Sequence, residues 1–146
     1  MGSPALGHLL VASAKAGSTD QEAVTAAVEV LGAELSVCHE PSDLDGALDR
    51  LDGRTLVVAG GDGSLHLAVT KLRARGELAR TRMALVPLGT GNDLARALDI
   101  PLDAAEAAQL VLSGSARPLD LARRLAGPAE GAQDAVRPAS LARGPR

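Results

Sequence analysis

The residues of this chain best suited to chemistry lie in two glycine-rich segments, residues 60–64 with the sequence GGDGS and residues 87–93 with the sequence PLGTGND. Each segment follows a short apolar run and precedes a stretch whose apolar residues recur at helical spacing. Glycines let the backbone turn sharply and approach a ligand closely, and the free N–H groups at the start of a helix bind anions. The two segments therefore predict strand–turn–helix corners that form two sides of a phosphate-binding pocket.

Polar side chains within these segments add to the same chemistry. The hydroxyl of Thr90 can donate to a phosphate oxygen, and Asn92 or Asp93 can cap the helix that follows. A carboxylate such as that of Asp62 is repelled by phosphates unless it caps backbone donors or works with Mg²⁺. Asp62 is thus either a helix cap in a tight turn or part of a metal-assisted site. Phosphoryl transfer is the leading hypothesis.

Composition limits the class of protein. With 146 residues, of which 46% are hydrophobic, the chain is long enough for one domain with its own core. It has no aromatic residue, so the core must be built from Leu, Val and Ala, and we expect modest stability. The net charge of −3 indicates no nucleic-acid partner. The single cysteine, Cys38, excludes an internal disulfide, and we expect a buried, unreactive thiol in a cytoplasmic protein.

Apolar runs and helical stretches alternate along the chain. We expect strands at 8–12, 35–39, 55–59 and 83–86, a fifth strand beginning at 118, and helices at 19–31, 41–51, 64–74, 92–98 and 104–113. Such alternation is typical of an α/β fold with three layers, in which helices cover both faces of a parallel, Rossmann-like sheet. Residues 1–122 are interpreted as one nucleotide-binding domain. Residues 123–146, rich in Arg, Pro and Ala, are predicted to be a disordered or loosely packed tail.

Residues 60–64 together with residues 87–96 resemble the diacylglycerol kinase catalytic-domain family, and the likeness extends over about residues 8–120. The resemblance implies ATP as phosphoryl donor, Mg²⁺, and a lipid hydroxyl as acceptor. It also implies which residues contact the nucleotide: Gly60, Gly61, Asp62, Gly63, Ser64, Leu65, His66, Gly89, Thr90, Gly91, Asn92 and His39. Asp62, Asp93 and Asp120 fall where the bacterial enzymes have aspartates that organise water around a magnesium ion.

The chain departs from the family pattern at several positions. Ser13-Ala14 stand where the family commonly has Asn-Pro, and His66-Leu67 stand where many members have Asn-Glu. His66 either reaches the nucleotide or is simply a partly buried helix residue, and Lys15 either approaches phosphate or is a solvated loop residue. The resemblance also implies a β-rich second domain that carries the general base, and we expect no counterpart of it after Asp120. No catalytic residue is therefore identified, and we expect a truncated chain without activity of its own.

Two other functions stay open at this stage. A NAD kinase-like enzyme would share the first glycine-rich segment, and a non-catalytic remnant could bind nucleotide without turnover. No apolar run is long enough to cross a bilayer. The expected partners are ATP and, for a complete enzyme, a lipid substrate, while association with a membrane surface and into homo-oligomers is left open.

Overall fold

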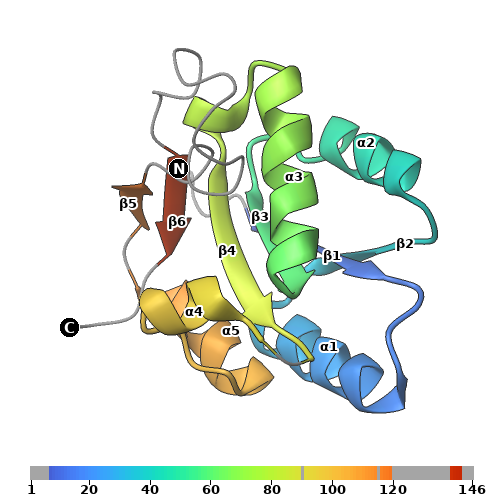
Figure 1. The fold of residues 1–146 in the computed structure, drawn as a ribbon, viewed down its shortest axis with the longest axis vertical. Helices are drawn as coiled ribbons and strands as arrows, with labels where there is room; N and C mark the ends of the chain where they lie inside the picture. The colour runs from blue at the N-terminus through green and yellow to red at the C-terminus, as the bar shows by residue number, and fades with distance from the viewer. Residues whose placement is uncertain (1–6, 90, 115, 120–138, 143–146) are drawn as a thin grey trace.

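The structure, a computed structural model, describes residues 7–89, 91–114, 116–119 and 139–142. A six-stranded sheet runs through its centre (Figure 1). The strands are β1 (His8–Ser13), β2 (Glu34–Cys38), β3 (Thr55–Gly60), β4 (Arg82–Pro87), β5 (Ala116–Leu119) and β6 (Ala139–Ala142). The helices are α1 (Ser18–Leu31), α2 (Pro41–Asp49), α3 (Asp62–Ala74), the 3₁₀ turn η1 (Leu78–Arg80), α4 (Asp93–Ala97) and α5 (Ala104–Ser113).

The sheet has the strand order β2-β1-β3-β4-β6-β5. Neighbouring strands pair in parallel from β2 to β6, and β5 is antiparallel to β6. Helices α2 and α3 pack on one face, while α1 and α5 pack together on the other (Figure 1). The predicted three-layer α/β fold is therefore confirmed, with one antiparallel strand at the edge of an otherwise parallel sheet.

Strands β1, β3 and β4 form the centre of the core because their side chains are apolar in continuous runs rather than in alternation. Leu9, Leu56, Met83 and Val86 are all 0% exposed. Such strands are covered by helices on both faces, as in other parallel sheets. Helix α1 ends as predicted at Gly32, whose φ of 62° is the left-handed conformation that favours glycine. Among the described residues, no helix has the length and apolarity required to cross a membrane.

One segment of the predicted tail forms a strand in the structure. Within residues 123–146, where the sequence pattern predicts no regular structure, residues 139–142 form β6 and lie between β4 and β5. β6 pairs with Arg82 and Met83 at the start of β4, which gives main-chain groups on that edge of β4 hydrogen-bond partners. These four residues of the predicted tail are thus part of the sheet. Residues 120–138 and 143–146 lie outside the described part of the chain.

Candidate nucleotide-binding site

The first glycine-rich corner is tighter than the sequence predicts. β3 ends at Gly60, Gly61 is the N-cap residue, and α3 begins at Asp62 rather than near Ser64. Gly63 and Ser64 therefore lie in the first helical turn, where main-chain N–H groups have no partner within the helix. A Cβ atom added at Gly60 would lie 2.5 Å from Ser64 Oγ and 2.7 Å from Ser64 Cβ. Only glycine fits at this position, because the first turn of α3 packs directly on the end of β3.

The second corner is held by its own asparagine. Gly89 and Gly91 have φ values of 71° and 83°, and Asn92 also adopts the left-handed conformation, with φ of 58°. The Asn92 side chain is 4% exposed, and its Nδ2 donates to the carbonyl oxygens of Leu88 and Gly89 at 3.2 and 3.4 Å. Its Oδ1 is buried without a hydrogen-bond partner. Thr90, which the resemblance places against the nucleotide, lies outside the described residues.

Asp62 joins the two corners. Its carboxylate accepts hydrogen bonds from the main-chain N–H groups of Asp93, at 2.9 Å, and Leu94, at 3.4 Å. A third link runs from the N–H of Leu88 to the carbonyl oxygen of Gly60, at 3.1 Å. Asp62 therefore caps α4, a helix 31 residues further along the chain, rather than its own helix. The two glycine-rich segments lie side by side, as the pocket hypothesis requires.

The same geometry bears on the predicted magnesium site. Both oxygens of Asp62 already accept main-chain hydrogen bonds, and Asp93 is exposed. Among the described residues there is no group of three His, Cys, Asp or Glu side chains that could hold a metal ion. Asp120, the third predicted aspartate, lies outside them. The described carboxylates thus do not fit a direct protein cage for Mg²⁺.

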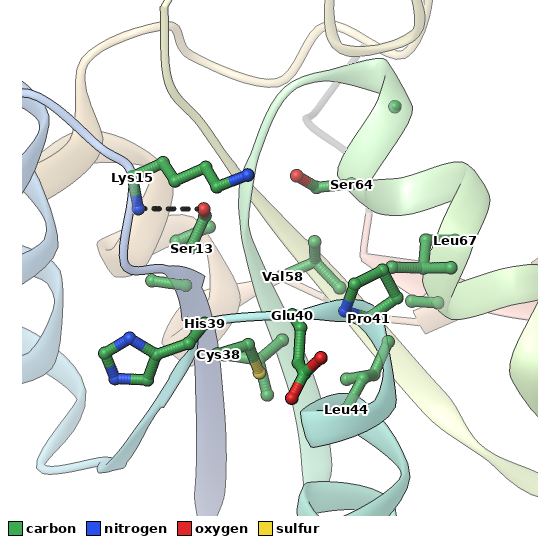
Figure 2. Close-up of a pocket in the computed structure, with 15 residues that line it drawn as sticks. Ser13, Lys15, Cys38, His39, Glu40, Pro41, Leu44, Val58, Ser64 and Leu67 are labelled. Carbon is green, nitrogen blue, oxygen red and sulfur yellow. Dashed lines mark hydrogen bonds between the residues drawn. The ribbon is translucent and has the colours of Figure 1, made fainter.

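A cavity of about 270 Å³ opens at the carboxyl ends of β1, β2 and β3 (Figure 2). The chain moves from β1 to one neighbour, β2, and then to the other, β3, so the strand order reverses at β1. In open α/β sheets ligands bind in the crevice at this reversal. The cavity is lined by Val11, Ala12, Ser13, Lys15, Cys38, His39, Glu40, Pro41, Leu44, Val58, Ala59, Gly63, Ser64, Leu67 and Ala68.

The cavity has a polar mouth and apolar walls. In Figure 2, Lys15 extends from the turn after β1 across the opening toward Ser64 at the start of α3. The turn is ordered by a hydrogen bond from the Lys15 N–H to Ser13 Oγ, at 3.1 Å. Deeper in, Val58 and Leu67 supply apolar surface. An ammonium group facing the N-terminal turn of a helix favours a bound anion, and the apolar walls suit the flat, weakly polar part of a ligand.

The predicted site residues divide between the cavity and its surroundings. Of the predicted set, His39, Gly63 and Ser64 line the cavity. Leu65 instead belongs to the core, 0% exposed, with its N–H bonded to the Gly61 carbonyl oxygen, because it is on the sheet-facing side of α3. His66 is exposed on α3 and is not among the lining residues. Gly60, Gly61, Asp62, Gly89, Gly91 and Asn92 build the joined corners beside the cavity.

On the side of the cavity formed between β2 and α2, sequence reasoning predicted His39 but missed the other lining residues. Glu40 and Pro41 line it, and so does the thiol-bearing residue Cys38. The signal was available, because β2 precedes a helix as β1 and β3 do, and the carboxyl end of each parallel strand reaches the same edge. This corner contains no glycine, so the glycine-rich pattern that marks the other two corners is missing here. Lys15, for which both interpretations were open, lies at the mouth.

Cys38 gives a chemical probe of the cavity. Burial raises the pKa of its thiol, the negative charge of Asp43 adds to this effect, and Arg50 partly opposes it. We expect Cys38 to alkylate slowly with iodoacetamide at neutral pH and faster as the pH rises through this elevated pKa, because the thiolate is the nucleophile. A ligand in the cavity should slow the reaction further. Mass spectrometry follows the modification, with Cys38→Ser as the unreactive control, and a rate equal to that of a free cysteine would contradict the placement.

Comparisons with known proteins agree with the fold and the corners. Residues 9–124 match the family described as diacylglycerol kinase catalytic domain. The chain is 40% identical over 119 residues to the "Probable lipid kinase YegS-like" protein of Pseudomonas aeruginosa (strain UCBPP-PA14), an alignment that covers 77% of this chain and 38% of that protein. A protein of the same name from Xanthomonas campestris pv. campestris (strain 8004) is 40% identical over 116 residues, covering 73% of this chain and 38% of the relative.

A crystal structure described as a diacylglycerol kinase from Bacillus anthracis str. Sterne matches with a TM-score of 0.59 at 26% identity, covering 77% of this chain and 42% of that one. The chain therefore spans 38% of the length of the two curated relatives. The residues that match the family, 9–124, include strands β2 to β5, most of β1 and both glycine-rich segments. Since the family match extends over most of the sequence and the fold agrees with it, this chain belongs to the diacylglycerol kinase catalytic-domain family.

Proposed function

We propose that this chain is the nucleotide-binding part of an ATP-dependent lipid kinase, which transfers the terminal phosphoryl group of ATP to a lipid hydroxyl. The observation that carries the proposal is the cavity at the reversal of strand order, where Lys15 and Ser64 face each other beside the N-terminus of α3. This site offers positive charge, hydroxyl groups and unpaired main-chain donors at one point, which are the groups that bind phosphate.

The residues around the cavity take distinct roles in this proposal. In this proposal the triphosphate lies against Lys15, Ser64 and the first-turn N–H groups of α3, while the base lies against the apolar wall that includes Leu67. The second glycine-rich corner has an indirect role: Asp62 binds the start of α4, and this contact holds the second corner against the first. Phosphoryl transfer needs mainly positioning and neutralisation of charge, and both can come from fixed main-chain groups.

Magnesium, when bound, would neutralise the phosphate oxygens and hold them in one geometry. Because the described residues do not provide a direct cage, the ion would be held chiefly by the nucleotide and its own waters. Of the three predicted aspartates, Asp93 is the one that is both described and exposed, and it takes the contact with those waters in this proposal. The proposal includes two residues outside the described part of the chain: Thr90 binds phosphate, and Asp120 contributes to the magnesium site.

Lys15→Ala tests the nucleotide site directly. A lysine that pairs with phosphate contributes a charge-assisted hydrogen bond, and its loss should weaken Mg·ATP binding by about tenfold to a hundredfold. Arg80→Ala is the matched control, because it also removes one positive charge. Arg80 lies just before β4, at the amino ends of the parallel strands, whereas the cavity lies at their carboxyl ends. Isothermal titration calorimetry measures both. Equal affinities for the two variants, or no binding by the parent chain, would contradict the proposal.

Transfer to a lipid is proposed for a protein of the length of the curated relatives. The chain spans 38% of its curated relatives, and none of the described residues is assigned as general base. We expect this chain to bind Mg·ATP without measurable phosphorylation of diacylglycerol vesicles in a radiolabel assay. Robust turnover would show that a base is present here after all. Binding with no turnover would also fit the second candidate, a non-catalytic nucleotide-binding protein.

A further inference from the structure

The corner between β2 and α2 is held by a side chain that does not line the cavity. Oδ2 of Asp43 accepts hydrogen bonds from the main-chain N–H groups of His39, at 2.8 Å, and Glu40, at 3.2 Å. His39 and Glu40 both line the cavity, and Asp43 does not. From these contacts, and resting on the proposed function, we infer that Asp43 is a positioning residue that holds the β2–α2 corner in the arrangement that binds nucleotide.

Two further contacts make this corner a single unit with its neighbours. The main-chain N–H of Asp43 in turn donates to the main-chain carbonyl oxygen of Glu40 at 2.9 Å, so the two residues are hydrogen-bonded in both directions at the start of α2. The N–H of Ala14, in the turn that leads to Lys15, donates to the Cys38 carbonyl oxygen at 2.9 Å. The corner that Asp43 holds is therefore joined to the turn that carries the lysine at the cavity mouth.

The physical effect is one of preorganisation. Without the carboxylate, the N–H groups of His39 and Glu40 turn to water and the exposed corner samples other conformations. Apparent affinity falls in proportion to the fraction of molecules whose corner is correctly arranged. If that fraction drops to about one tenth, Mg·ATP binding weakens by about tenfold. Asp43→Asn keeps an oxygen of the same reach and should recover most of the affinity, whereas Asp43→Ala should not.

The chain contains a matched control for the loss of a helix cap. Oδ2 of Asp103 accepts from the N–H of Glu106 at 3.0 Å at the start of α5, on the other face of the sheet. Asp43→Ala and Asp103→Ala each remove an aspartate that caps a helix, so both should lower thermal stability to a similar extent. We expect nucleotide affinity, measured at a temperature where both variants are folded, to fall in Asp43→Ala alone.

A second readout follows the corner itself. Asp43→Ala and Asp43→Asn both remove the negative charge that acts on Cys38, so a difference between them reports movement rather than electrostatics. We expect Cys38 to react faster with iodoacetamide in Asp43→Ala than in Asp43→Asn. Unchanged affinity in Asp43→Ala, or equal losses in Asp43→Ala and Asp103→Ala, would overturn the inference while the proposed function stands. Failure of the parent chain to bind Mg·ATP would instead overturn the proposed function, and with it the inference.

Discussion

Asp62→Ala is expected to destabilise the protein by about 2–4 kcal/mol, because the change removes two hydrogen bonds in which the acceptor is charged. The N–H groups of Asp93 and Leu94 would lose their acceptor, and the short helix α4 would lose the contact that holds its start against the first corner. Urea unfolding followed by far-ultraviolet circular dichroism measures the effect, since the chain has no Trp or Tyr for fluorescence.

Two further variants test whether this loss of stability comes from the hydrogen bonds that Asp62 accepts. Asp62→Asn keeps one carbonyl oxygen as an acceptor and should fall between the parent chain and Asp62→Ala. Glu22→Ala removes an exposed carboxylate from α1 and should change stability by no more than about 0.5 kcal/mol. If Asp62→Ala were as stable as Glu22→Ala, the bridge between the two corners would be unimportant for folding. If its stability fell but Mg·ATP binding were unaffected, the bridge would be structural alone.

Gly60→Ala should destabilise the first corner by about 1–3 kcal/mol through overpacking. The added methyl group would lie 2.5 Å from Ser64 Oγ and 2.7 Å from Ser64 Cβ, so a rotation of the hydroxyl does not relieve the clash. The start of α3 would have to move away from β3, and the donors that face the cavity would move with it. We therefore expect both the urea midpoint and the affinity for Mg·ATP to fall.

A second substitution, at Ser64, should relieve this clash. Gly60→Ala combined with Ser64→Gly removes both atoms that the new methyl group would meet, so the double variant should lose less stability than the two single changes added together. Gly63→Ala is the control in the same turn, since an added Cβ there has no neighbour within 4 Å. It should be neutral or slightly stabilising, because alanine favours a helix over glycine. A Gly60→Ala variant as stable as Gly63→Ala would show that the corner is not close-packed.

Local features of the sequence were sufficient to locate most elements. The apolar run at 55–59 became β3, Gly32 ends α1, and Asp103 caps α5, because each of these signals acts within a few residues. Boundaries shifted where a longer-range contact decided them. Helix α3 begins at Asp62, whose carboxylate accepts hydrogen bonds from the start of α4, and no residue near Asp62 in the sequence indicates that partner.

The sequence by itself determined the chemistry available at each corner: glycines that allow close packing, a hydroxyl at Ser64, an ammonium at Lys15, and a strand–helix alternation that requires a parallel sheet. The tertiary structure decided which corners share a cavity. Because β1 lies between β2 and β3, the ends of these three strands enclose the cavity, while the second glycine-rich corner lies beside it and is bound through Asp62. Strand order follows from how the helices pack on the two faces of the sheet, and that packing is a property of the whole chain rather than of any local segment.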